Sequence, residues 1–304
     1  DRKTATLKAQ QIAKEVNRRL HGTGTEAGFE GVVVKSMVFE VPRDEPEKLT
    51  GVKELTQTVE EAREQRQAEE TEAFEKAKES IRLHYWPITN IRKRLVSMYR
   101  SELMVPEGMM PEDGSETGAL ECAMDIATIQ LARAAMEEKP RAKPFLLMPV
   151  HMETITNKRF REAILVELKL LPDWAERRLL LYVTGIDDDV PQTVVHNSFT
   201  YLAPFCAGFV GGFSRKFKRA DQLQGAGLIG TACDAGDAQK VTPDLVEELS
   251  NFVVNNHGAR NRTFFFGAPD LDTATSARKV HYDYVDGPGV APALGSFGPV
   301  FMVA

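Results

Sequence analysis

Short apolar runs alternate with amphipathic stretches from residue 81 to the end of the chain. The apolar runs lie at residues 81–89, 95–105, 145–150, 179–184, 208–213, 227–233, 263–267 and 282–285. Helical periodicity fills most of the gaps, at residues 118–138, 158–170, 192–202, 216–224, 243–256 and 271–279. Strands that alternate with helices are typical of a parallel sheet buried on both faces. The pattern therefore predicts a closed βα barrel, a fold of about 250 residues.

The first two predicted strands are joined by a short basic turn, at residues 90–94. This turn leaves no room for a helix, and strands connected so closely pair in antiparallel fashion. We therefore expect an α/β protein, a modified (βα)8 barrel whose first two strands run antiparallel. The barrel is expected to occupy residues 81–304.

The residues before the barrel follow a different pattern. Residues 4–20 predict an amphipathic helix and residues 31–41 a strand, so residues 1–50 are expected to form a helical or α/β appendage. Residues 51–80 are highly charged, and Val52, Leu55, Val59 and Ala62 fall at coiled-coil spacing. This segment is predicted to be either a charged linker helix or a dimerisation helix, and the pattern favours neither.

Composition narrows the class of protein. The chain has 304 residues, 42% of them hydrophobic, with a formal net charge of -6, which argues against a nucleic-acid partner. Its three cysteines, Cys122, Cys206 and Cys233, lack metal-ligand spacing and indicate reduced thiols in the cytoplasm. No apolar run approaches the roughly 20 residues that span a bilayer. Because the chain opens with Asp1 rather than Met, we expect a fragment or a trimmed chain.

Several segments of the predicted barrel resemble EAL domains, the cyclic di-GMP phosphodiesterase family, in their order and spacing. The family's opening strands are matched by IRLHYWPITNIRKRLVSMYRSEL, its third strand by FLLMPVHMETITNKRF and its fourth by LLLYVTGI. An Asp-Asp-Phe-Gly signature is replaced by FVGGFS, and the closing strand, helix and loop are matched by TFFFGAPDLDTATSARKVHYDYVDGPGVAPAL. The resemblance covers residues 81–294 and implies an EAL-type barrel. The run AKESIRLHYWPI also resembles the end of a GGDEF-like domain entering an EAL domain, so the preceding segment is interpreted as a remnant of such a domain.

The resemblance also implies that the metal-binding positions of the family are degenerate here. Two divalent metals need several anionic oxygens that converge at the C-terminal ends of the strands. The positions concerned carry Tyr99, His151, Tyr182, Gly185, Gly211, Gly212, Ala232, Phe266, Pro269 and Asp286. Phenyl, phenol and hydrogen groups do not ligate hard cations. We expect no metal, no cofactor and no phosphodiesterase activity, with open space at Gly211 and Gly212 and with Tyr99, Tyr182 and Phe266 able to fill it.

Three functions remain open. The first is a catalytically inactive signalling or scaffold protein that acts through a protein partner or as a homodimer. The second is a non-catalytic cyclic di-GMP receptor, with Arg100, Arg215 and Asp234 as candidate ligand-binding residues. The third is an enzyme of different chemistry on the same barrel that uses Asp187–Asp189, although a loop with a helix N-cap is the simpler interpretation of that triplet.

Overall fold

The structure is a computed structural model that describes residues 65, 68–106, 118–139, 141–187, 190–236 and 241–302. The chain divides into two compact units, residues 1–66 and 67–304. The predicted appendage at residues 1–50 and most of the charged segment at 51–80 lie outside the described residues. Nearly all of the described residues belong to the second unit.

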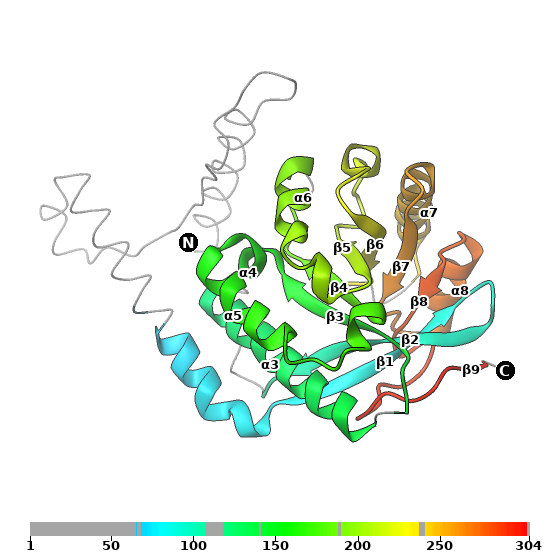
Figure 1. Ribbon diagram of the computed structural model, residues 1–304. Coiled ribbons are helices and arrows are strands. Elements are labelled where there is room, and N and C mark those ends of the chain that lie inside the picture. Colours follow the sequence, from blue (N-terminus) through cyan, green and yellow to red (C-terminus); the bar gives the residue numbers. More distant parts are fainter. Residues whose placement is uncertain are drawn as a thin grey trace, which may run out of the picture. The chain divides into compact units, whose positions relative to one another are not determined.

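The second unit is a closed barrel of eight strands with helices on its outside (Figure 1). The strands are β1 (Arg82–Asn90), β2 (Leu95–Met104), β3 (Phe145–His151), β4 (Leu179–Thr184), β5 (Gly208–Gly212), β6 (Leu228–Asp234), β7 (Arg262–Phe266) and β8 (Tyr284–Val285). The helices are α3 (Gly118–Glu138), α4 (Met152–Thr156), α5 (Lys158–Leu168), α6 (Gln192–Thr200), α7 (Pro243–Gly258) and α8 (Leu271–Lys279). Short 3-10 turns are η2 (Lys78–Ser80), η3 (Ala175–Arg177), η4 (Ala203–Phe205) and η5 (Ala220–Leu223).

Strand pairing confirms the predicted barrel and its antiparallel opening. Strand β1 runs antiparallel to β2 on one side and to β8 on the other. Strands β2 to β8 pair in parallel, each with the next along the chain. A further short strand, β9 (Phe301–Met302), pairs antiparallel with the start of β2 and was not predicted. A pair of residues is too short to show a period of two, so the sequence carries no signal for it.

One predicted helix, at residues 216–224, is wrong. The structure has only the 3-10 turn η5 there. The buried side chains are Phe217, Ala220 and Leu223, which recur every third residue. A spacing of three matches the three residues per turn of a 3-10 helix better than the 3.6 of an α-helix. Phe217 also stacks on Phe213, with ring centroids 4.0 Å apart, and this contact fixes the loop before the turn.

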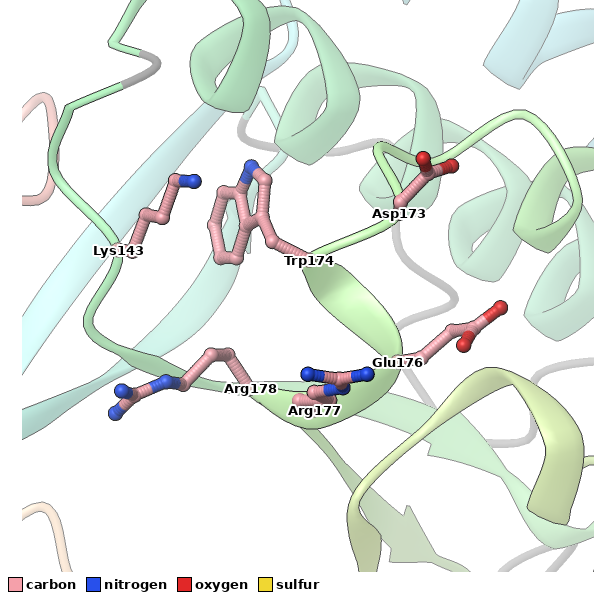
Figure 2. A pocket seen from close by; sticks show the side chains of 6 residues that line it. All are labelled: Lys143, Asp173, Trp174, Glu176, Arg177 and Arg178. Carbon is pink, nitrogen blue, oxygen red and sulfur yellow. The ribbon is translucent and has the colours of Figure 1, made fainter.

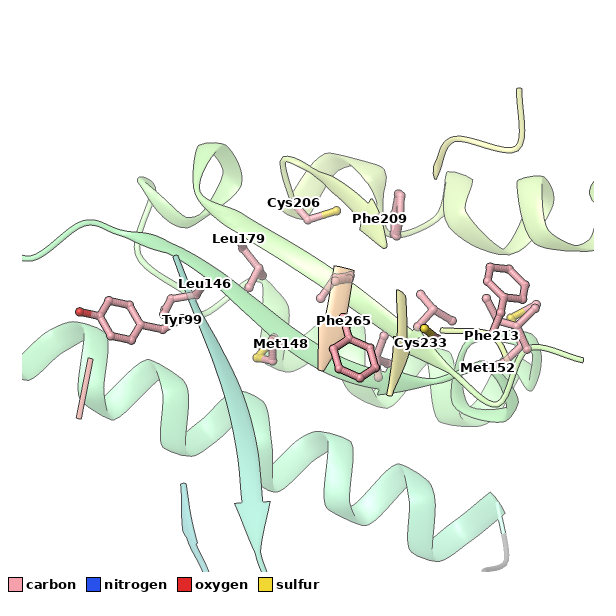
Figure 3. Close-up of a cluster of buried hydrophobic side chains, with 14 of the residues drawn as sticks. Tyr99, Leu146, Met148, Met152, Leu179, Cys206, Phe209, Phe213, Cys233 and Phe265 are labelled. Atoms are coloured by element: carbon pink, nitrogen blue, oxygen red, sulfur yellow. The ribbon is translucent and has the colours of Figure 1, made fainter. Parts of the chain in front are cut away.

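The strands bury both of their faces because their side chains alternate between two apolar clusters. The outer cluster packs between strands and helices, and part of it is seen in Figure 3. The inner cluster fills the barrel with Ile88, Met98, Leu147, Leu180, Tyr182, Val210, Ala232, Phe264 and Phe266. Neighbouring residues in one strand therefore face different environments, and a shift of one position changes a side chain from inside to outside.

The end of the charged segment packs against the barrel unit. Residues 68–77 are helical, and Phe74 is 1% exposed. Phe74 shares an apolar cluster with Ile81, Leu120 and Met124, which come from the start of the barrel and from α3. The contact concerns only the end of the segment, so both predicted roles of residues 51–80 stay predictions. Among the described residues, no helix is long and apolar enough to cross a membrane.

A buried carboxylate ties strands together at the amino end of β7. The side chain of Asp283 accepts hydrogen bonds from the Thr263 N–H at 3.0 Å and from Arg262 at 3.3 Å, and it lies 3.1 Å from His257 Nε2. Burial acts to raise the pKa of Asp283, but the Thr263 N–H, His257 and Arg262 outweigh it, so this pKa lies below its ordinary value. A depressed pKa means that the ionised carboxylate stabilises the folded state.

We expect Asp283→Asn to lower the free energy of unfolding by about 1–3 kcal/mol at pH 7, the usual cost of a disrupted buried polar network. Since the pKa is depressed on folding, this contribution is present above the unfolded pKa of about 3.9 and is lost as pH falls through the folded value. Urea unfolding at pH 7 and at acid pH should therefore show the gap to wild type narrowing in acid. Exposed Asp221→Asn is the matched control, and an equal gap at both pH values would contradict this role.

Candidate functional site at the barrel mouth

The barrel mouth, defined here as the carboxyl ends of the parallel strands together with the residues on the inner face beside them, is where barrel enzymes hold their chemistry. Five inner residues form its centre: Arg100 on β2, Tyr182 on β4, Gly212 on β5, Phe266 on β7 and Asp286 directly after β8. They are brought together by the closure of the sheet, since β2 and β8 lie on either side of β1.

A buried ion pair lies at the middle of the mouth. Arg100 Nε donates to Asp286 Oδ2 at 2.7 Å, and Arg100 Nη2 donates to Oδ1 at 3.2 Å. The Gly267 N–H also donates to Oδ1, at 2.8 Å. The side chain of Asp286 is 0% exposed and that of Arg100 is 13% exposed. Both carboxylate oxygens of Asp286 are thus engaged in a two-pronged pairing, the strongest kind of side-chain hydrogen bonding.

The charges of this pair depend on each other. Burial raises the pKa of Asp286, while the Arg100 guanidinium and the Gly267 N–H oppose that effect. Burial also acts to lower the pKa of Arg100, but the Asp286 carboxylate outweighs it and the pKa of Arg100 is raised. Arg100 therefore stays a cation, and its guanidinium carbon lies 5.0 Å from the centroid of the Phe266 ring, where the ring face favours positive charge.

Aromatic rings fill the space beside the ion pair. Tyr182 meets Phe266 edge to face, with ring centroids 5.1 Å apart. A side chain at Gly212 has no room, because a Cβ there would lie 2.9 Å from the Tyr182 ring and hydroxyl. Burial raises the pKa of Tyr182, so its hydroxyl stays protonated. The space left by the missing side chain at Gly212 is filled by the ring of Tyr182, one of the three aromatic residues predicted to be able to fill it.

Three residues predicted to belong to the mouth are not part of its centre. Tyr99 lies in the outer cluster, and its hydroxyl donates to the Pro299 carbonyl at 3.1 Å. Gly211 faces outward, where a Cβ would lie 2.6 Å from the Phe213 ring. Pro269 is exposed beyond the end of β7. Alternation explains the first two cases, because each residue sits one position away from an inward neighbour, Arg100 and Gly212 respectively.

The remaining predicted positions are spread around the rim. His151 ends β3, and its Nδ1 lies 2.8 Å from Oδ1 of Asp125, a buried acid on α3. Gly185 follows β4 with φ +70, a left-handed conformation that favours glycine, and a Cβ there would meet nothing within 4 Å. Ala232 is buried in the inner cluster and has no polar side chain. Asp234 ends β6 and is exposed.

Arg215 is turned away from the centre of the mouth. Its Nε donates to Glu248 on α7 at 3.2 Å, and its Nη1 donates to the Ala235 carbonyl at the end of β6. These contacts anchor the loop after β5 to α7. Of the predicted triplet Asp187–Asp189, only Asp187 belongs to the described residues, while Asp188 and Asp189 lie outside them.

Two residues of the mouth are not among the predicted site residues. Glu102 is two positions beyond Arg100 and so shares its inward side, and Trp86 is paired with Arg100 across the β1–β2 ladder. The Trp86 indole N–H donates to Glu102 Oε2. The alternation of side chains along β2 predicts that Glu102 faces the same side as Arg100, so this pattern could have identified Glu102 from the sequence.

This geometry defines a class of protein, namely a βα barrel whose opening strand pair is antiparallel and whose mouth is closed by side chains. Searches with known family models and among curated proteins found no match to the sequence. Solved structures do match, and they show that the chain has the fold of EAL domains.

Three of these structures illustrate the likeness. The EAL domain of Xanthomonas citri FimX, in complex with c-diGMP, is 20% identical with a TM-score of 0.55, over 78% of this chain and 98% of its own. An EAL domain protein from Listeria monocytogenes is 11% identical with a TM-score of 0.56, over 72% of this chain and 92% of its own. Bacillus subtilis YkuI, in complex with substrate c-di-GMP and calcium, is 12% identical with a TM-score of 0.56, over 74% of this chain and 57% of its own.

The calcium in that last complex raises the question of whether this mouth fits a cation. In this chain, both carboxylate oxygens of the inner acid Asp286 accept hydrogen bonds from Arg100 and the Gly267 N–H. The Glu102 carboxylate accepts a hydrogen bond from Trp86. A fixed guanidinium at the centre repels a second cation. Among the described residues, no three His, Cys, Asp or Glu side chains cluster as metal ligands do. The described mouth therefore does not fit a divalent cation.

Proposed function

We propose that this chain is a catalytically inactive EAL-like signalling or scaffold protein that acts through a protein partner or a second copy of itself. The observation that carries the proposal is the Arg100–Asp286 ion pair, packed on Phe266 at the centre of the mouth. In this mouth the positive charge belongs to the Arg100 side chain. In a phosphodiesterase of the two-metal type, the positive charge belongs instead to bound metal ions, which activate the attacking water.

The ion pair also has a structural consequence that fits a scaffold. It joins β2 to the segment after β8, and the Gly267 N–H adds the end of β7 to the same carboxylate. Strand ends that are cross-linked in this way hold the rim rigid, whereas an enzyme of this kind keeps its rim accessible to substrate. The outer surface, rather than the mouth, is then the part that meets other molecules.

The second candidate is a non-catalytic receptor for cyclic di-GMP. It is favoured by the likeness to the FimX EAL domain, which was solved with c-diGMP. The contacts of the two candidate phosphate partners weigh against it. Arg100 is engaged by Asp286, and Arg215 by Glu248 and a backbone carbonyl, so either would have to exchange a partner to bind a phosphate.

Titration calorimetry with cyclic di-GMP separates the two candidates. We expect no heat of binding at ligand concentrations up to about 100 μM, with or without magnesium, because a phosphate must displace a buried carboxylate from Arg100 at a cost of several kcal/mol. Binding in the low micromolar range would replace the scaffold proposal with the receptor. In that case Arg215→Gln should weaken binding more than Lys279→Gln, which changes an exposed cation on α8.

A further inference from the structure

The end of the barrel opposite the mouth carries a basic surface. The loops that lead into β2, β7 and β8, together with the first residue of β7, expose the side chains of Arg92, Lys93, Arg94, Arg260, Arg262 and His281. The parallel strands of a barrel all begin at the same end, so these loops lie on one side of the molecule. We call these six residues the basic face, and none of them belongs to the mouth.

A single buried carboxylate ties the loops of the basic face together. Asp283 Oδ1 lies 3.3 Å from Arg262 Nη1 and 3.9 Å from Arg92 Nη2, and the Asp283 carbonyl accepts from the Ile91 N–H at 3.0 Å. Two guanidinium groups therefore share one acid, whose side chain is only 4% exposed. The surface above this acid keeps an excess of positive charge on a chain whose net charge is -6.

The other cations of the basic face have no acid beside them in the described part of the chain. No salt bridge there involves Lys93, Arg94 or Arg260. Their charges are thus available to an anionic partner outside the barrel.

Apolar side chains are exposed directly beside the basic turn. Strand β9 pairs with the start of β2, with Met302 opposite Leu95 and Phe301 opposite Val96. Leu95 follows Arg94 in the chain, so β9 lies next to the turn, as Figure 1 shows. Met302 is 71% exposed and Phe301 is 44% exposed. Cations next to exposed apolar side chains are typical of proteins that lie on an anionic membrane.

Further cations at this end of the barrel are spread apart. Lys143, Arg177 and Arg178 precede β3 and β4 and line a pocket of about 370 Å³. Figure 2 shows their side chains directed to separate places, and the guanidinium carbon of Arg178 lies 4.8 Å from the centroid of the Phe145 ring. This arrangement does not converge on one small anion. It fits a broad surface whose negative charges are themselves spread out.

We propose that this end of the barrel binds the surface of a membrane that contains anionic lipids. The basic face lies on the headgroups, and Phe301 and Met302 insert between them. Charge alone fits a nucleic acid or an acidic protein equally well, but the apolar pair favours lipid, which offers an apolar phase directly beneath its charges. The mouth then faces away from the membrane, because it lies at the other end of the barrel.

The proposal does not rest on the proposed function, because the basic face and the apolar pair share no residue with the mouth. A negative result here leaves that function standing.

Cosedimentation of the full chain with lipid vesicles tests the charged part of the surface. Vesicles of phosphatidylcholine with about one third phosphatidylglycerol should bind the chain, vesicles of phosphatidylcholine alone should not, and added salt should weaken binding. Lys93→Gln/Arg94→Gln should weaken binding about 25-fold, or about fivefold for each cation removed. Lys158→Gln/Arg159→Gln removes the same charge from exposed residues at the start of α5, at the mouth end, and should have little effect.

The apolar pair has a test of its own. Phe301→Ser/Met302→Ser should weaken binding about tenfold and leave its salt dependence unchanged, because apolar burial is lost and no charge is altered. Met104→Ser/Leu271→Ser is the matched control. Met104 is 43% exposed and Leu271 is 71% exposed, but both lie at the mouth end, so their removal should not change binding.

Each of the other outcomes overturns the proposal. It fails if the chain does not sediment with the anionic vesicles at low salt, or if vesicles of phosphatidylcholine alone bind it equally well. The assignment to these residues fails if both variants of this end fold, as judged by circular dichroism, and bind like wild type. Duplex DNA or polyglutamate that binds more tightly than the vesicles at the same salt would identify a nucleic acid or an acidic protein as the partner instead.

Discussion

Replacement of Asp286 by alanine should lower the free energy of unfolding by about 3–5 kcal/mol, a large share of the stability of a typical domain. The reason is that Arg100, whose side chain is only 13% exposed in this structure, would stay charged and lose the carboxylate that now pairs with it. The Gly267 N–H would lose its acceptor as well. Urea unfolding followed by circular dichroism measures the change.

Asp234→Ala is the matched control for this result. Asp234 also ends a strand at the mouth, but it is exposed, so its removal should cost less than about 0.5 kcal/mol. Equal losses for the two alanine variants, or a loss below about 1 kcal/mol for Asp286→Ala, would mean that the buried pair does not hold the mouth together.

Removal of Arg100 instead of Asp286 should make the free energy of unfolding depend on pH. In Arg100→Leu, burial raises the pKa of the remaining Asp286 carboxyl and no guanidinium opposes it. Because that pKa is raised above its unfolded value, stability is retained at acid pH and lost as pH rises through the folded value. The Asp286→Ala variant does not share this pH dependence, because an unpaired arginine side chain does not lose its proton and stays a buried charge.

The double variant Arg100→Leu/Asp286→Leu should regain most of the stability, because it leaves no buried charge unpaired.

Most of the barrel could be predicted from the sequence because its signals are local. The strands are short segments rich in apolar residues, and the short turn at residues 90–94 fixes the antiparallel pair. The helix predicted at 216–224 failed because a window of nine residues does not separate a spacing of three from one of 3.6 when only three positions are apolar. The appendage at residues 1–50 and the role of residues 51–80 stay predictions, since the first lies outside the described residues and the second lies mostly outside them.

The mouth was harder to predict than the barrel, because its contents depend on which way each side chain points. Tyr99, at which the resemblance places the family's signature position, is one residue away from Arg100, yet Tyr99 is a phenol in the outer layer and Arg100 is a cation in the mouth. Local alternation could have resolved this, since Met98 and Arg100 share one side of β2.

The partner of Arg100 could not be found in the same way. Arg100 and Asp286 are 186 positions apart in the sequence, and only closure of the barrel brings them to 2.7 Å. No local pattern marks Asp286 as the acid that will face a guanidinium. The sequence identified it only as one of the degenerate metal-binding positions, and its pairing with Arg100 is seen only in the fold.

The absence of phosphodiesterase activity is the second prediction with a large expected effect, since enzymes of this kind accelerate their reactions by about 10⁶-fold or more. The loss should be complete rather than partial, because Arg100 engages the Asp286 carboxylate at the centre of the mouth, Glu102 accepts from Trp86, and Tyr182 stays a neutral phenol. Neither group activates water in the way that a metal-bound hydroxide does.

Incubation of the full chain with cyclic di-GMP and magnesium or manganese, followed by separation of the nucleotides, tests this claim most directly. The structure predicts that cyclic di-GMP is recovered intact, at the level of a blank without protein. A linear dinucleotide that accumulates in proportion to protein, and that a chelator abolishes, would contradict it.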